Sequence, residues 1–133
     1  MIFVDTSFLI AGIDDRDPHH QAAVLLGQQL AGRRMLTSNH VRGESWTWFR
    51  RKRWHGKAVE LLDALRDGSS NVRVAFVPEE IEAEALRWLR RHDEREYSFV
   101  DATSFAYMRA RGIEEALAFD GDFAAAGFTE LRP

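Results

Sequence analysis

The chain has 133 residues, 45% of them hydrophobic, and a formal net charge of −3, which fits one compact domain with a substantial core. A weakly acidic balance does not suggest a protein that coats nucleic acids. The absence of cysteine excludes a disulfide scaffold and a thiolate metal site. No apolar run approaches the ~20 residues of a membrane span, and the chain opens on a strand rather than a signal peptide. We therefore expect a cytoplasmic protein with a single domain over residues 1–133.

Short apolar runs alternate with longer amphipathic ones along the whole chain. In chain order the predicted elements are strand 2–4, helix 7–13, helix 18–31, strand 35–37, helix 39–54, helix 58–66, strand 72–77, helix 78–92, helix 100–111, strand 116–119 and a possible edge strand at 130–132. Asp17, Ser38 (or Asn39) and Ser98 are the expected helix caps, and Gly112 is expected to end the last helix. This alternation predicts an α/β fold, a parallel sheet covered by helices on both faces.

Four acidic residues far apart in the sequence should meet at one edge of this sheet. Asp5 and Asp120 directly follow predicted strands, and the carboxyl ends of parallel strands share an edge. Glu44 lies early in the helix that leaves the second strand, and Asp101 lies in the first turn of the helix that returns to the fourth. Carboxylates without histidine or cysteine companions are typical of a site for a hard divalent cation.

Each carboxylate also has a purely structural explanation, and the residues alone leave these open. Asp5 could cap the helix after it, Asp101 fits a capping box with Ser98, and Asp120 could belong to a plain turn. Glu44 faces inward on its helix and could pair with a nearby arginine or with His40, one turn before it.

Gathered together, the carboxylates require a counter-charge. Two like charges ~4 Å apart repel by about 4 kcal/mol at an effective dielectric constant near 20. A divalent ion offsets this repulsion and supports hydrolysis of phosphate esters by lowering the pKa of bound water.

A basic segment follows Glu44 and is the candidate for contact with RNA. Cations beside aromatic side chains suit phosphates and unpaired bases. An equally weighted alternative is a solvated helix end, where positive charge favours the helix dipole. The candidate residues are Arg50, Arg51, Arg53 and Lys57.

Four segments in order, 1–10, 37–44, 97–106 and 117–123, resemble the motifs of PIN-domain nucleases, and especially VapC toxins of bacterial toxin–antitoxin modules. The resemblance implies a three-layer α/β/α domain with a four- to five-stranded sheet, a homodimer, and endoribonuclease activity that depends on Mg²⁺ or Mn²⁺. It also implies inhibition by a VapB-type antitoxin. By position, the catalytic and metal-binding quartet is Asp5, Glu44, Asp101 and Asp120, with Asp122 as a possible further ligand.

Residues 92–101 and 118–128 are most similar to VapC members that cut the sarcin–ricin loop of 23S ribosomal RNA, and other members cut tRNA. Two rival interpretations are weaker. A dehalogenase-type phosphatase needs a second aspartate where this chain has Ser7. A non-catalytic PIN module that binds RNA or protein would not need to retain the quartet.

Overall fold

The computed structural model describes residues 1–66 and 70–133. The strands are β1 (Ile2–Val4), β2 (Met35–Ser38), β3 (Val72–Ala75), β4 (Glu115–Leu117) and β5 (Thr129–Glu130). The helices are α1 (Thr6–Ile13), α2 (His20–Gln29), α3 (Asn39–Arg51), α4 (His55–Arg66), α5 (Glu79–Arg91), α6 (Phe99–Arg111) and α7 (Asp122–Ala125). None of the helices within the described ranges has the length and apolarity needed to cross a membrane.

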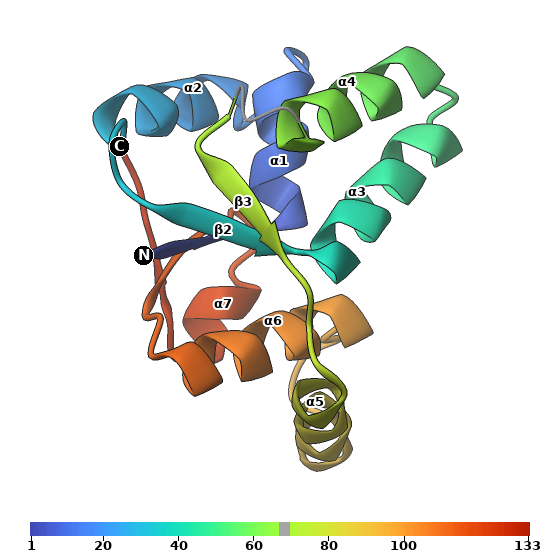
Figure 1. Ribbon diagram of the computed structural model, residues 1–133, viewed down its shortest axis with the longest axis vertical. Helices are drawn as coiled ribbons and strands as arrows, with labels where there is room; N and C mark the ends of the chain where they lie inside the picture. Colours follow the sequence, from blue (N-terminus) through green and yellow to red (C-terminus); the bar gives the residue numbers. More distant parts are fainter. Residues whose placement is uncertain (67–69) are drawn as a thin grey trace.

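The five strands form one sheet in the order β3-β2-β1-β4-β5, and every neighbouring pair is parallel. The chain first moves outward from β1 through β2 to β3, and then returns to place β4 on the other side of β1. Right-handed crossovers therefore put the helices of the two halves on opposite faces. Figure 1 shows α1 to α4 on one face of the sheet and α5 to α7 on the other. The predicted α/β sandwich with a parallel sheet is confirmed.

The central strand explains why the sequence opens on an unbroken apolar run. Ile2, Phe3 and Val4 are completely buried, because helices cover both faces of the sheet and neither face of β1 meets water. The edge strand β3 is only partly buried along its length. The point where the strand order reverses lies between β1 and β4, where open α/β sheets place their ligands.

Most predicted caps are present. The Ser38 hydroxyl accepts from the Val41 amide and caps α3, and Ser98 caps α6. Gly112 ends α6 in the left-handed conformation, with φ at 67°. This conformation suits glycine because it has no Cβ to clash with the backbone.

Several boundaries differ from the prediction. The helix expected from residue 18 begins at His20, because Asp17 accepts the His19 amide through its side chain and its backbone takes part in turns. The helix expected to reach residue 54 ends at Arg51, and Arg53 turns the chain with φ at 61°. β3 ends before Val77, whose amide donates to the Asn39 side chain instead of continuing the ladder.

Candidate active site

Asp5 lies at the carboxyl end of β1 and is almost completely buried. Its carboxylate accepts from the Ser7 amide at 3.1 Å and from the Ser7 hydroxyl at 2.7 Å, so it caps α1 as the structural alternative suggested. Burial, and then the nearby charge of Asp120, raise its pKa from 3.8 to about 7. A helix cap does not require a buried carboxylate with a raised pKa, so capping alone does not explain why Asp5 is buried close to another carboxylate.

Asp101 lies in the first turn of α6, 7% exposed. The Ser98 amide donates to its carboxylate at 2.9 Å, and its own amide donates to the Ser98 hydroxyl at 2.9 Å, which completes the predicted capping box. Burial raises the pKa of Asp101 to about 6, with a contribution from Asp120, against the hydrogen bonds from Ser98. The box fixes one carboxylate oxygen and thereby sets the orientation of the side chain.

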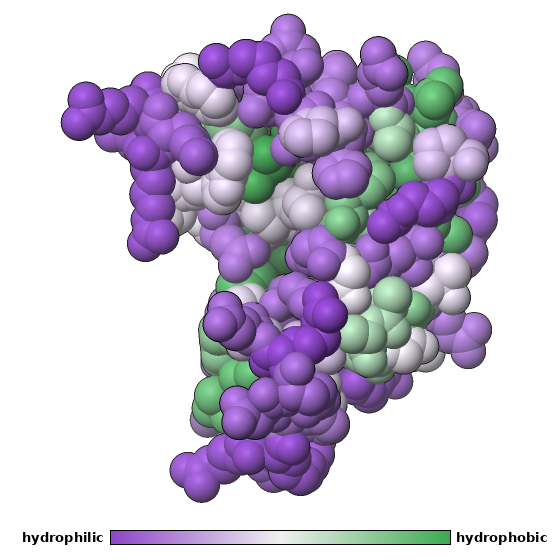
Figure 2. Space-filling model, turned by 180° about the vertical axis from the view of Figure 1, so that it is seen from behind, coloured by the Kyte–Doolittle hydropathy of each residue, from purple (hydrophilic) through white to green (hydrophobic). Residues whose placement is uncertain are grey.

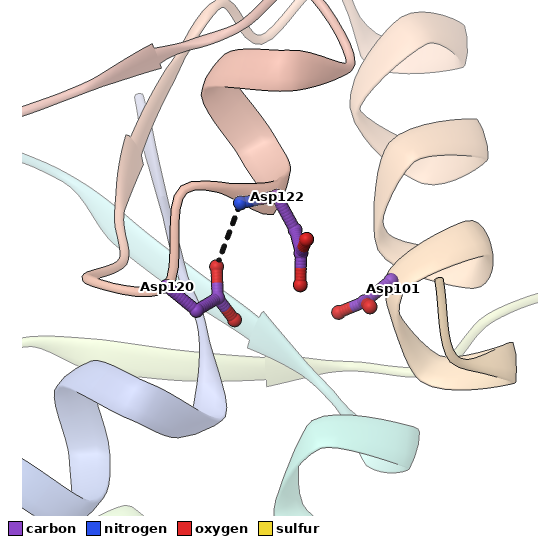
Figure 3. Close-up of side chains that lie close together, drawn as sticks. All are labelled: Asp101, Asp120 and Asp122. Atoms are coloured by element: carbon purple, nitrogen blue, oxygen red, sulfur yellow. Dashed lines mark hydrogen bonds between the residues drawn. The ribbon is translucent and has the colours of Figure 1, made fainter. Parts of the chain in front are cut away.

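Asp120 and Asp122 come from the turn that follows β4. The Asp122 amide donates to the Asp120 carboxylate at 3.0 Å, and Gly121 between them has φ at 82°. One carboxylate oxygen from each of Asp101, Asp120 and Asp122 lies within 4.8 Å of the others, and the three side chains point toward one another (Figure 3). We call these three residues the acidic cluster. Burial raises the pKa of Asp120 as well.

Glu44 projects from α3 and is half-buried. Its carboxylate accepts from the Thr6 hydroxyl at 2.6 Å. An ion pair between Glu44 and an arginine is not found among residues 1–66 and 70–133. The alternative pairing of Glu44 with His40 is wrong, because the His40 ring lies 2.8 Å from the carboxylate of Glu82 on α5. The Glu44 carboxylate is therefore held by a neutral hydroxyl donor.

The quartet lines one cleft of about 680 Å³. This carboxylate cleft opens between the helices on the two sides of the sheet edge, and Figure 2 shows the outline of the molecule notched there, between the part that carries α3 and α4 and the part that carries α5. Its lining residues are Asp5, Thr6, Ser7, Ile10, Asn39, His40, Gly43, Glu44, Thr47, Trp48, Arg51, Val100, Asp101 and Asp120. Asp122, the third member of the acidic cluster, is not among these lining residues.

The basic segment is divided by the turn between α3 and α4. Of its four predicted RNA-contact residues, Arg51 lines the carboxylate cleft and Arg50 is exposed on the same helix. Arg53 and Lys57 line a separate hollow with Trp54 and His55. Lys57 also donates to the Ile13 carbonyl at 3.2 Å and lies 3.7 Å from Glu60. The structure thus brings only Arg51 to the carboxylates.

Arg95 is a site residue that the sequence analysis missed. It lies in the loop between α5 and α6. Its guanidinium donates to the Asp122 carboxylate, with Nε at 2.9 Å and Nη2 at 2.8 Å. The available signal was its position six residues before Asp101, in the loop that delivers that carboxylate to the site.

The donor set fits a hard divalent cation. Carboxylate oxygens from three or more directions are the ligands that Mg²⁺ and Mn²⁺ take in proteins, and the acidic cluster has them within reach of a single ion. Burial and neighbouring carboxylates raise the pKa of Asp5 and Asp101, because both disfavour negative charge. A bound divalent cation would offset this effect and favour loss of the proton.

A five-stranded parallel sheet with four carboxylates in a cleft at its switch point is the arrangement expected of a PIN domain. The sequence profile of the PIN domain matches residues 2–129, and the chain belongs to this family. It is 53% identical to the 23S rRNA-specific endonuclease VapC20 of two Mycobacterium tuberculosis strains, CDC 1551 and H37Rv, over 100% of this chain and 99% of each relative. The crystal structure of M. tuberculosis VapC20, described as a sarcin–ricin loop cleaving toxin, superposes with a TM-score of 0.91 at 52% identity, covering both chains completely.

Proposed function

We propose that this chain is the toxin of a toxin–antitoxin module and hydrolyses a phosphodiester bond in the sarcin–ricin loop of 23S ribosomal RNA. The observation that carries the proposal is 53% identity across the full length to a 23S rRNA-specific endonuclease. The carboxylate cleft supports it, because the chain has the acidic residues such a nuclease needs at the edge of the sheet where they can act together. Residues 1–133 then work as one catalytic domain in the cytoplasm.

The side chains divide the work according to their positions. Asp5, Asp101 and Glu44 are the proposed ligands of a Mg²⁺ or Mn²⁺ ion, and Asp120 and Asp122 complete the site on the β4 side. The ion, when bound, lowers the pKa of a bound water and neutralises charge on the phosphate.

Hydrogen bonds hold the ligands of the proposed site in place. Ser7 orients Asp5, Ser98 orients Asp101, and Thr6 orients Glu44. Such partners reduce the reorganisation that binding requires.

Contact with RNA begins at the mouth of the carboxylate cleft. Arg51 lines it and Arg50 lies on the same helix, so both are proposed to contact phosphates next to the bond that is cut. Arg53 and Lys57 line the next hollow along α3 and α4 and are proposed to contact RNA farther from the cut. As a homodimer, the protein would offer two such surfaces to a structured RNA, and a VapB-type antitoxin would inhibit it by covering the cleft.

The decisive experiment compares wild type with Asp5→Asn after brief induction, with 5′ ends mapped across all cellular RNA. Wild type should create one new end in the sarcin–ricin loop and arrest growth, whereas Asp5→Asn should do neither. Asp15→Asn makes the same chemical change at an exposed position and should behave as wild type.

Three other outcomes have definite meanings. A new 5′ end confined to a tRNA would show that the substrate is tRNA, which is the alternative, and not the sarcin–ricin loop. Equal cutting by wild type and Asp5→Asn would contradict the metal mechanism. Harmless expression without any new RNA end would remove the nuclease proposal.

A further inference from the structure

A second hollow of about 240 Å³ adjoins the carboxylate cleft, and three of its seven lining residues have aromatic rings. Three rings reach it, from the turn before α2, from α3 and from the end of β4, namely His19, Trp48 and Phe119. We call this hollow the aromatic pocket. Its other lining residues are Ser7, Ile10, Asp17 and Asp120, and it shares Ser7, Ile10, Trp48 and Asp120 with the carboxylate cleft. A ligand can therefore extend from one into the other.

The rings of the aromatic pocket are already arranged for stacking. The His19 ring lies flat on Phe119, with centroids 4.5 Å apart and an angle of 4° between the planes. His19 is exposed and the Phe119 ring is half-buried, with Phe8 stacked on it at 5.9 Å. An exposed imidazole stacked on a supported ring adds little to the core. It does present a flat π surface to whatever enters the pocket.

Cations border the same rings. The Lys52 ammonium lies 5.3 Å from the Trp48 ring. The Arg132 guanidinium lies 5.1 Å from the Phe119 centroid but is also paired with the Glu130 carboxylate at 3.0 Å, so Lys52 is the stronger source of positive charge at these rings. Aromatic faces for bases, combined with positive charge for the phosphates between them, are the composition by which proteins hold unpaired nucleotides. An apolar small-molecule site would not need these cations.

Two hydrogen bonds fix the aromatic pocket relative to the acidic residues. The Phe119 amide donates to the Ser7 hydroxyl at 3.0 Å, and that hydroxyl donates to the Asp5 carboxylate at 2.7 Å. The residue after Phe119 is Asp120. The stacking surface and the carboxylates are thus linked by hydrogen bonds, and a nucleotide with its base in the pocket would have its phosphate near Asp5 and Asp120.

We propose that the aromatic pocket is a nucleobase subsite, which takes one unpaired base next to the phosphate that is cut and stacks it on His19. This inference rests on the proposed RNA-cleaving function. A base enters only after it has left its own stack, because inside a helix both of its faces are covered. The pocket would then select loops over duplexes without reading a particular sequence.

The first test measures binding without cleavage, in buffer free of divalent ions. The probes are two short single-stranded RNAs, one fully abasic and one with a single fluorescent 2-aminopurine. Wild type should bind the strand with one base about 5- to 150-fold more tightly, which is the range of stacking on aromatic side chains, and should quench its emission. His19→Ala should lose most of this preference. His92 also stacks on an aromatic ring, Trp88, at 4.1 Å but lines neither hollow, so His92→Ala should keep it.

Phe119→Leu is a second variant, which keeps the bulk of the half-buried side chain but removes the ring. It should show the same loss as His19→Ala, and a thermal melt identifies any general damage. Equal preference for the single base in wild type, His19→Ala and Phe119→Leu would overturn the subsite.

The second test measures cleavage of a sarcin–ricin hairpin with an abasic nucleotide on either side of the cut bond. At one of the two positions, removing the base should lower kcat/KM of wild type. The same removal should barely change kcat/KM of His19→Ala, because the base and the His19 ring act through one shared contact and their effects are not additive. Cleavage without this coupling contradicts the subsite and leaves the nuclease function intact. A single-base preference that depends on His19, without any cleavage, keeps the subsite and contradicts the function.

Discussion

At the scale of single residues, Asp122 differs from the other carboxylates because an arginine holds it. Arg95 contacts Asp122 through two nitrogens, whereas among residues 1–66 and 70–133 the donors to the Asp101 and Asp120 carboxylates are neutral backbone amides. The pair brings one positive charge to the rim of the acidic cluster. The positive charge of Arg95 lowers the repulsion among the three carboxylates, and it also weakens their attraction for a metal ion.

We therefore expect Arg95→Ala to bind Mn²⁺ about 2- to 5-fold more tightly than wild type, since partly exposed ion pairs are worth about 0.2–1 kcal/mol. Isothermal titration calorimetry measures this directly. Arg90→Ala removes an exposed arginine from the end of α5 and serves as the control. Weaker Mn²⁺ binding by Arg95→Ala would instead mean that Arg95 positions Asp122 as a ligand.

At the scale of elements, α6 delivers Asp101 through its own N-terminal cap. The same carboxylate satisfies the Ser98 amide and faces the acidic cluster. The Asp101 side chain therefore caps α6 and still offers a carboxylate oxygen to the acidic cluster, so capping is compatible with the proposed metal binding. The tight first turn is what gives the carboxylate a fixed direction.

Ser98→Ala should cost about 0.5–2 kcal/mol of stability, because the Asp101 amide loses its acceptor, and should also reduce metal-dependent RNA cleavage by about 10- to 100-fold. Denaturant unfolding and single-turnover cleavage measure the two effects. Ser104→Ala removes a hydroxyl on the same helix that bonds only the Val100 carbonyl. It should change stability with little effect on cleavage, and equal losses of cleavage in both variants would contradict the positioning role of Ser98.

The elements that the sequence predicted well are those with strong local signals. Buried apolar runs marked β1, β2 and β4, and Ser98 and Gly112 marked the ends of α6. Because alternating strands and helices predict parallel strands, whose carboxyl ends share an edge, the meeting of the quartet at that edge was also predictable.

Contacts between distant side chains had no such signal. The pairing of Arg95 with Asp122 spans 27 residues and that of Thr6 with Glu44 spans 38, and neither has a periodicity. The basic segment looked continuous in sequence. The turn at Arg53, with its positive φ, sends its two ends to different hollows.

At the scale of the whole molecule, the buried carboxylates make stability depend on pH. The pKa of Asp5 is raised from 3.8 to about 7 and that of Asp101 from 3.8 to about 6. At pH values between the unfolded pKa of 3.8 and these raised values, the folded state binds more protons than the unfolded state. The free energy of unfolding therefore falls as the pH rises from about 4 to about 7. Each tenfold change in proton affinity is worth about 1.4 kcal/mol, so the loss from the two groups together is on the order of 7 kcal/mol.

Metal-free protein should therefore melt several degrees higher near pH 5 than near pH 7.5, as followed by circular dichroism in a chelating buffer. Saturating Mn²⁺ should reverse this order, because it binds the deprotonated carboxylates. Asp5→Asn should flatten the metal-free dependence, while Asp15→Asn at an exposed position should not. A wild-type midpoint that does not change with pH would contradict the raised pKa values.

The proposed homodimer has a candidate surface on the segment that crosses from β3 to α6. Phe76, Leu86 and Phe99 expose 67%, 52% and 40% of their surface, and large apolar side chains in water favour association. We expect Leu86→Glu to shift the mass measured by light scattering from dimer to monomer. Leu25→Glu, at an exposed position on α2, is the matched control. A monomeric wild-type protein would contradict the dimer.

The order of the strands has a consequence for synthesis on the ribosome. β4 completes the centre of the sheet beside β1, yet it is made from residues 115–117 of a 133-residue chain, and Asp120 and Asp122 follow it. An unfinished polypeptide thus lacks both the strand that aligns its first acidic residue and the last members of the cluster. A fragment from the amino-terminal side that ends before residue 120 therefore lacks two of the three carboxylates of the acidic cluster.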